Sequence, residues 1–487
     1  MTASGGTSKP QRGPEDKGPA NPTVVAVFLA TAAAVGGFLF GFDSSVINGA
    51  VDAIQDDFGV SDFLIGFVVS SALLGCVVGA WFTGPVSDRI GRARTMLLLA
   101  VIFAVSSIGA ALAVGPADLI AWRLFGGLAI GGASVIVPAY IAEIAPAHMR
   151  GRLGSLQQMA IVLGIFAALV TDYVIARVSD GGAGGEFPLG GTAWRWMFGS
   201  ELLPAALYAV IALILPESPR YLVKRRRTEE ARRVLTRVMP AEQVQTKLDE
   251  IRASLAEDRP VRLGDLRGDR LGLRPIVWIG ILLAVFQQFV GINVIFYYST
   301  SLWQSVGADE GDAMFTSIIN SLVNVVFTVV AIALIDRVGR RRLLIVGAAG
   351  MAVSLGTLAV CFSTAAVVDG EPVLGDLAGP LALVAANTFV ASFAVSWGPV
   401  MWVMLGEMFN NFIRASALAV AAAVNWLANW VITTTFPALS GFSLTLAYGL
   451  YTAFSVLALL FVLRYVPETK GIELEDMDRL SSPRATA

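Results

Sequence analysis

The dominant pattern along the chain is a series of apolar segments, each long enough to cross a membrane. A helix that rises 1.5 Å per residue needs about 20 apolar residues to cross roughly 30 Å of hydrocarbon. Six such segments precede a charged stretch, at residues 23–50, 62–83, 93–114, 117–141, 153–177 and 193–215. Six more follow it, at residues 273–302, 312–335, 342–366, 379–408, 413–440 and 443–466. The pattern predicts an all-α membrane protein with twelve transmembrane helices.

The polar segments divide the chain into five expected parts. Residues 1–22 are rich in Gly, Pro and Ser and contain no cleavable signal pattern, which indicates a disordered tail and a retained first span. Residues 217–272 are charged, with apolar residues at helical spacing, and predict a linker of short surface helices. This linker separates a six-helix half at 23–216 from another at 273–466, and a second tail covers 467–487.

The distribution of Lys and Arg predicts the orientation in the membrane. The connections after the first, third, seventh, ninth and eleventh spans contain neither residue, and the connection after the fifth has at most Arg177 and Arg195. Nearly all the other basic residues of the connections follow even-numbered spans. Because cytoplasmic loops carry the excess of Lys and Arg, we expect the linker and both termini in the cytoplasm, beneath the cell membrane.

Composition excludes several classes of function. The chain of 487 residues is 55% hydrophobic and 15% charged, with a net charge of −2, so it is not a wholly water-soluble protein and has no basic surface for nucleic acid. Cys76 and Cys361 lie in apolar runs, and the single histidine, His148, excludes a histidine-rich metal site. Without a metal cluster or a nucleophile paired with a base, the chain is expected to be neither an enzyme nor a cofactor-binding protein.

An internal duplication is visible in three pairs of matching segments. "DRIGR" after the second span matches "DRVGR" after the eighth, and "PESPR" after the sixth matches "PETKG" after the twelfth. A Glu also precedes an Arg by seven residues after both the fourth and the tenth span. Matches in the same order indicate two parallel six-helix repeats, which place a substrate site midway through the membrane where the repeats meet.

The charged residues of these segments are candidates for a cytoplasmic gate. Their Arg and carboxylate side chains could hold the two halves together when the cytoplasmic side is shut, although each exposed pair contributes only roughly 0 to 1 kcal/mol. They could also serve only as topology signals. The candidates are Asp88, Arg89, Arg92, Glu143, Arg150, Glu217, Asp336, Arg337, Arg340, Glu407, Arg414 and Glu468.

Two charged residues lie within apolar spans of the first half. Asp43 is about twenty residues into the first span, and Arg123 is near the start of the fourth. Since a charge in hydrocarbon is costly, each is a functional candidate, and the two are natural partners. If the pair separates during transport, Asp43 can gain and lose a proton; the alternative is a permanent ion pair that only fixes helix packing.

Neutral amides form a second set of candidates, concentrated in the second half. They supply hydrogen-bond donors and acceptors without net charge, and indole rings offer apolar faces to C–H groups. This combination suits an uncharged, polyhydroxylated ligand, whereas a single amide can equally join two helices. The polar residues are Gln157, Gln158, Gln287, Gln288, Asn293, Tyr297, Tyr298, Asn320, Asn324, Asn425 and Asn429.

These motifs resemble the sugar porter family of the major facilitator superfamily over residues 23–475. The resemblance rests on "GFD", "DRIGR", "DRVGRR", "PAYIAEIAP", "MRGRLGSLQQ", "PESPR", "QQFVGIN", "GPVMW" and "PETKG". Within the family, the chain is most similar to bacterial proton symporters of glucose, xylose and inositol. The resemblance implies the major facilitator fold and alternating access.

The resemblance also implies which residues bind the sugar and the proton. It assigns sugar contacts to Phe40, Gln158, Gln287, Gln288, Asn293, Tyr297, Asn324, Gly398, Trp402 and Asn425. The last of these occupies a position where relatives carry Gln, which leaves the identity of the sugar open. The resemblance assigns the proton to Asp43 and Arg123, and adds Glu201 in "WRWMFGSELLPA".

The expected function is proton-coupled import of a neutral monosaccharide, most readily glucose, by a monomer. The alternatives are an uncoupled uniporter, a symporter of xylose, galactose or myo-inositol, and a non-transporting sugar receptor. The segment after Gly471 is short for a signalling tail, which disfavours the receptor.

Overall fold

Twelve stretches of the chain form helices that are long and apolar enough to cross a membrane, which confirms the predicted number and the all-α class. The computed structural model describes residues 22–146, 149–257, 263–268, 272–368, 371–409 and 413–470, and the count refers to these. In the first half the spans are α1 (Pro22–Val46), α3 (Asp62–Ile90), α4 (Arg92–Ala111), α5 (Pro116–Ile144), α6 (Arg150–Val178), and α7 (Ala193–Ser200) continued by α8 (Leu202–Ile214). In the second half they are α12 (Pro275–Phe289) continued by α13 (Ile292–Gln304), α14 (Glu310–Val338), α15 (Arg340–Ser363), α16 (Ala378–Ala394) continued by α17 (Trp397–Met408), α18 (Arg414–Phe442) and α19 (Leu444–Tyr465).

The structure moves several of the predicted boundaries, most of all that of the second span, which continues to Ile90 instead of ending at residue 83. The first span ends at Val46 instead of residue 50, because the chain turns there and starts the short helix α2 (Val51–Phe58). The ninth ends at Ser363, because β1 (Ala366–Val368) then pairs antiparallel with β2 (Glu371–Val373) in a small ribbon that the sequence did not predict. The predictions for residues 1–21 and 471–487 and for His148 concern positions outside the described residues.

Three spans are interrupted where apolar periodicity alone predicts one continuous helix. The sixth breaks at Glu201, the seventh at Gly291, whose φ of 85° is left-handed, and the tenth at Ser396. Breaks in membrane helices are tolerated where the freed backbone groups are buried in protein or line a cavity. Each break therefore marks a place to search for a site.

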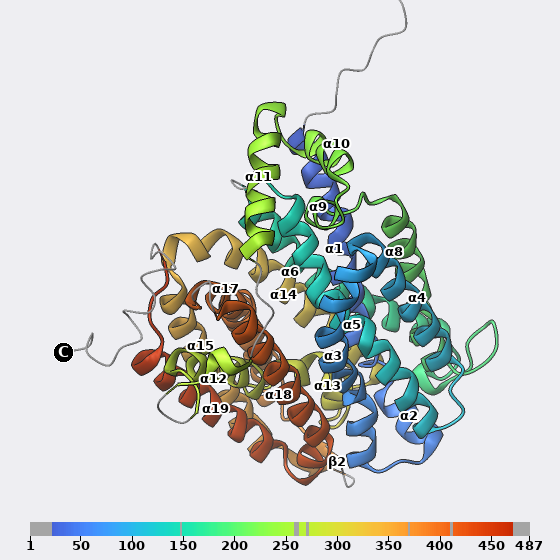
Figure 1. Cartoon of the computed structure of the whole chain (residues 1–487). Coiled ribbons are helices and arrows are strands. Elements are labelled where there is room, and N and C mark those ends of the chain that lie inside the picture. The colour runs from blue at the N-terminus through green and yellow to red at the C-terminus, as the bar shows by residue number, and fades with distance from the viewer. Residues whose placement is uncertain are drawn as a thin grey trace, which may run out of the picture.

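Short helices follow the sixth span and gather at one end of the molecule (Figure 1). They are α9 (Pro219–Lys224), α10 (Thr228–Val238) and α11 (Ala241–Glu257), which pack against one another. The 3₁₀ turn η3 (Leu263–Leu266) follows them in the chain, and a further 3₁₀ turn, η2 (Gly182–Gly184), lies between α6 and α7. Figure 1 shows α10 and α11 at the top and α2 at the opposite end. We call the top the linker end and the other the far end.

Glycine allows the helices of the first half to pack with their backbones in close contact. A Cβ on Gly127 of α5 would lie 2.0 Å from the carbonyl oxygen of Ala72 on α3, and one on Gly41 of α1 would lie 1.9 Å from that of Ile161 on α6. Small residues at such crossings are what membrane helices use to approach closely. This packing holds α3 close to α5 and α1 close to α6, and α1 also packs against α5.

Candidate functional site

A buried acid–base cluster lies inside the first half. Arg123 on α5 donates from Nη1 to both carboxylate oxygens of Asp43 on α1, at 3.3 Å each, and to the Asp43 backbone carbonyl at 3.3 Å. Both residues are only 4% exposed. The structure therefore joins the two charged residues that the sequence singled out as partners.

Glu201 completes this cluster from the break between α7 and α8. It is buried beside Asp43 and Arg123, and its Oε1 has no hydrogen-bond partner. The Arg123 guanidinium lies 5.7 Å from the centre of the Phe198 ring, and its Nε is also without a partner. The cluster thus contains two carboxyl groups and only one guanidinium. One carboxyl group can therefore hold a proton while the other is paired with Arg123.

A network of amides lies in the second half, around the breaks in the seventh and tenth spans. Gln287 donates from Nε2 to the carbonyls of Trp397 and Gly398, at 3.0 and 3.4 Å. Asn425 on α18 donates from Nδ2 to Gln287 Oε1 at 2.8 Å. The network ties the broken α12 and α17 to the continuous α18.

The same network extends towards α13. Gln288 donates from Nε2 to Asn425 Oδ1 at 3.1 Å and accepts at Oε1 from Asn293 Nδ2 at 2.6 Å. Five sugar-site candidates are therefore linked: Gln287, Gln288, Asn293, Gly398 and Asn425. We call the four amides among them the amide network.

The other sugar-site candidates are placed less directly. Phe40 on α1 packs against Trp426, the residue after Asn425, with ring centroids 5.4 Å apart, so an aromatic contact bridges the two halves beside the amide network. Tyr297 and Asn324 are buried, Gln158 is half-buried, and Trp402 is 39% exposed. Hydrogen bonds do not join the last three to the amide network.

At the far end, the two halves are held together by hydrogen bonds. Asn48, in the turn between α1 and α2, donates from Nδ2 to the carbonyl of Phe296 and accepts from Thr300 Oγ1, at 3.0 and 2.5 Å. Glu310 of α14 accepts from the Ala183 amide at 2.9 Å, and the hydroxyl oxygens of Ser70 and Thr434 are 2.6 Å apart. The interface between the halves is closed at this end.

Two matching charge clusters occupy the linker end. In the N-terminal charge cluster, Arg92 pairs with Asp88 at 2.9 Å and with Glu143 at 3.0 Å, and its backbone N–H donates to Glu217 at 2.7 Å. In the C-terminal charge cluster, Arg340 has the same partners in the repeat: Asp336 at 2.9 Å, Glu407 at 2.8 Å and, from its backbone N–H, Glu468 at 2.9 Å.

The glycine of each repeated motif explains why the N-terminal and C-terminal charge clusters have the same geometry. Gly91 and Gly339 have φ values of 102° and 97°, a conformation that glycine adopts without strain. A Cβ there would lie 2.1 Å from Glu217 and 2.7 Å from Glu468. Glycine thus turns the chain and admits the carboxylate to the start of the next helix, where the free N–H groups favour an anion.

The clusters differ from the expected gate in what they connect. Each ion pair joins helices of one half, whereas the sequence suggested pairs between the halves. Arg89 and Arg337 are exposed, and their carbonyls accept from Tyr221 and Lys470. Arg414 donates to the carbonyl of Phe409, and the side chain of Arg150 lies outside the described part of the chain.

Loss of one guanidinium from such a cluster should destabilise the fold. We expect Arg340→Met to lower the free energy of unfolding by roughly 1.5 to 3 kcal/mol, because the carboxylates of Asp336 and Glu407 lose a charged hydrogen-bond donor. Thermal unfolding in detergent measures this, with Arg342→Met as the control, since Arg342 is exposed on the same helix. Equal melting temperatures for the two variants would contradict a stabilising role.

Sequence reasoning did not select some residues of the site. Trp426 was not singled out as the partner of Phe40, and Asp172 on α6, 1% exposed, was not considered. The second had a visible signal, since it is a carboxylate within an apolar span.

A family model described as "Sugar (and other) transporter" matches residues 29–480. The chain is 52% identical over 452 residues to a glucose transport protein of Synechocystis, covering 93% of this chain and 96% of the relative. It is 38% identical over 491 residues to the D-xylose-proton symporter of Escherichia coli, covering 93% and 95%. It is 36% identical over 456 residues to the arabinose-proton symporter of Bacillus subtilis, covering 93% and 94%.

Solved structures give the same result. The inward open conformation of the xylose transporter XylE from Escherichia coli matches with a TM-score of 0.79 at 36% identity, covering 93% of this chain and 99% of that one. The proton:xylose symporter XylE bound to 6-bromo-6-deoxy-D-glucose matches with a TM-score of 0.76 at 37% identity, covering 94% and 100%. These relatives are transporters and not enzymes.

Proposed function

The chain belongs to the sugar transporter family, and we propose that it is a symporter that imports a neutral monosaccharide, with glucose as the first candidate, together with a proton. Its twelve spans and its bacterial relatives make it a multi-pass protein of the cell membrane. The observation that carries the coupling is the buried contact of Asp43 with Arg123. A lone carboxylate could not remain charged in such a dry site, whereas the Arg123 guanidinium keeps its charge, so the protonation of Asp43 depends on its distance from Arg123.

The proposed cycle uses two separate sites. Protonation of Asp43 from outside weakens its attraction to Arg123 and frees α1 to move relative to α5. The sugar binds between the halves, held mainly by the amide network and by Phe40. The neutral amides suit its hydroxyl groups, and each of the four binds another member of the network when the sugar is absent.

Several further assignments belong to this proposal. The excess of Lys and Arg in the connections after even-numbered spans supports a cytoplasmic location of the linker end and of both termini, with the far end facing outward. The chain divides into tails at 1–22 and 467–487, halves at 23–216 and 273–466, and a linker at 217–272. The protein acts as a monomer, and the charge clusters act as the cytoplasmic gate by holding helix ends within each half.

The match to a glucose transport protein supports glucose, while the xylose and arabinose relatives keep pentoses as candidates. The test of the sugar is uptake of labelled glucose into vesicles, competed by unlabelled glucose, xylose, galactose, arabinose and myo-inositol. Glucose is expected to compete best, and stronger competition by a pentose would reassign the sugar.

The test of coupling uses vesicles that contain the purified protein and an imposed pH gradient, alkaline inside. Labelled sugar is expected to accumulate above its outside concentration and to leak out when a protonophore collapses the gradient. Uptake that never exceeds equilibration would instead identify a uniporter.

A further inference from the structure

Asp172 is a buried carboxylate to which the proposed cycle assigns no role. It lies on α6, two turns from the far end of that helix, and is 1% exposed. Its Oδ2 accepts a long hydrogen bond of 3.4 Å from the Gly49 amide, and its Oδ1 has no partner. Asp43, by contrast, has a guanidinium beside it.

No positive charge compensates Asp172 in the described part of the chain. Of the charged and titratable groups in the nearby parts of the elements packed against α6, none forms an ion pair or a hydrogen bond with it. These groups are Asp43 on α1, Asp118 and Arg123 on α5, Arg195 and Glu201 at α7, Glu310 and Asp312 on α14, and Tyr173 and Arg177 on α6 itself. Several have other partners: Arg195 pairs with Asp57, and Glu310 accepts from Ala183. A buried, uncompensated carboxylate is costly when charged, so it takes up a proton instead.

The position of Asp172 connects this proton to the closure of the far end. Gly49, which Asp172 contacts, follows Asn48 in the turn between α1 and α2. Asn48 is the residue that binds α13 of the other half through Phe296 and Thr300. The turn is thus held between Asp172 on one side and the second half on the other. A Cβ on Gly49 would lie 2.8 Å from the Asp172 Cβ, so the contact is tight.

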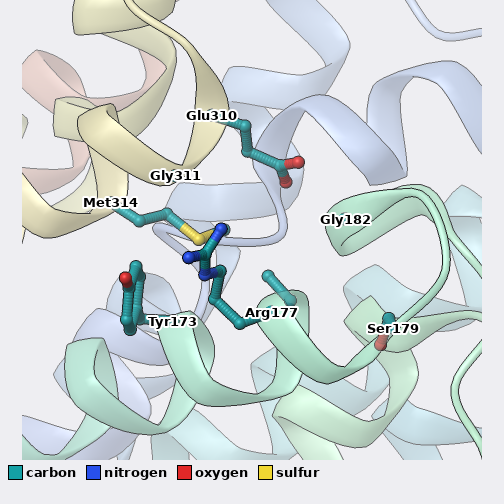
Figure 2. A pocket seen from close by; sticks show the side chains of 8 residues that line it. Tyr173, Arg177, Ser179, Gly182, Glu310, Gly311 and Met314 are labelled. Carbon is teal, nitrogen blue, oxygen red and sulfur yellow. The ribbon is translucent and has the colours of Figure 1, made fainter.

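A pocket at the interface between the halves lies one helical turn from Asp172 along α6. It has a volume of about 240 Å³ and lies between α6 and α14. It is lined by Tyr173, Ala176, Arg177 and Glu310, among others, and Figure 2 shows the end of the Arg177 side chain beside Met314. Ala176 is one helical turn from Asp172 on α6. Separation of α14 from α6 would extend the pocket to Asp172.

We propose that Asp172 is a second proton-binding site, which is protonated when the far end closes and ionised when it opens. It is distinct from Asp43 and does not require that its proton cross the membrane. It acts as a sensor of external pH that favours the closed far end in acid. The inference rests on one part of the proposed function, namely that the far end and the linker end open alternately.

The sign follows from which state binds the proton. The closed state holds Asp172 neutral, whereas the open state exposes it to water, where a carboxyl group is ionised at neutral pH. Acid therefore favours closure, and one linked proton changes the equilibrium by up to tenfold per pH unit. Asp52 on α2 acts in the same direction: burial raises its pKa, the charges of Asp56 and Glu310 raise it further, and the nearby Ser301 hydroxyl opposes them. Every variant in the test therefore keeps Asp52 unchanged.

The experiment measures the open and closed populations directly. Spin labels at Leu189→Cys and Leu377→Cys, two exposed positions at the far end of the two halves, report their separation by pulsed electron resonance. Cys76→Ala and Cys361→Ala remove the native thiols. Asp172→Asn keeps the shape and the acceptor of a protonated Asp172, and Asp312→Asn replaces an exposed carboxylate near the same interface as the control. All are compared in the Asp43→Asn background, which removes the other proton.

We expect the closed fraction of the parent to fall as the pH rises. Asp172→Asn should keep the closed fraction high at every pH. The change of the closed-to-open equilibrium constant per pH unit should be smaller than in the parent by up to a factor of ten. Asp312→Asn should match the parent. The infrared difference spectrum between the parent and Asp172→Asn should also show the loss of one band of a protonated carboxyl group, a measurement that needs no transport. Unchanged slope and unchanged band would overturn the inference. Failure of the wild-type protein to accumulate sugar would overturn only the symport proposal.

Discussion

Vesicles that contain Asp43→Asn should lose all accumulation of sugar while still exchanging labelled for unlabelled sugar. Asn cannot gain or lose a proton, so sugar movement is no longer linked to the gradient. Exchange survives because the amide network lies on α12, α13 and α18, away from the acid–base cluster. The effect is large: one coupled charge is driven by about 2.3 kcal/mol per 100 mV, which sustains about fiftyfold accumulation of a neutral solute.

The control for this experiment is Asp376→Asn, which replaces an exposed carboxylate in the second half. It should accumulate sugar as the wild-type protein does. Accumulation by Asp43→Asn at the wild-type level would assign the ion pair with Arg123 to helix packing alone. Loss of exchange together with accumulation would indicate that Asp43 also shapes the sugar path.

Gln287→Ala should raise the KM for sugar uptake by about 30- to 700-fold. Gln287 is central to the amide network, since it donates to two carbonyls of the broken tenth span and accepts from Asn425. Under the proposed function, its loss removes hydrogen-bond partners of the sugar hydroxyls and leaves those hydroxyls unpaired in the binding site. The loss of two hydrogen bonds, each contributing roughly 1 to 2 kcal/mol, gives the stated range of KM.

Initial rates of uptake over a range of sugar concentrations measure this effect. Asn387→Ala is the matched control: Asn387 is an amide on α16 that bonds the carbonyl of Leu383 and lies outside the network. Its KM should stay within about twofold of the wild-type value, as expected for a residue that contacts no ligand. A wild-type KM for Gln287→Ala would remove this residue from the sugar site.

The sequence predicted the architecture well because hydrocarbon imposes a simple rule. A span must be about 20 apolar residues and must satisfy its own backbone hydrogen bonds, so the number of helices can be read from the residues alone. The breaks at Glu201, Gly291 and Ser396 could not be predicted this way. A break is tolerated only where neighbouring helices supply hydrogen-bond partners for the freed backbone groups. These neighbouring helices are distant in sequence.

Part of the candidate site could also be predicted. Asp43 and Arg123 are visible as charges in apolar spans, and their partnership follows because each needs the other in a dry interior. The repeated motifs identified Arg92 and Arg340, but not whether their partners lie in the same half. The choice of partner depends on which helix ends meet in the tertiary structure, which brings Glu143 to Arg92 and Glu407 to Arg340.

By itself, the sequence determined that this protein lies in a membrane, that it crosses it twelve times in two related halves, and that it carries charges where charges are expensive. These are consequences of composition and spacing, which each segment carries locally. Only the tertiary structure decided which charges are neutralised. It gave Asp43 a guanidinium and gave Asp172 a backbone amide beside the closing interface, because compensation depends on distances of a few ångströms between residues far apart in the chain.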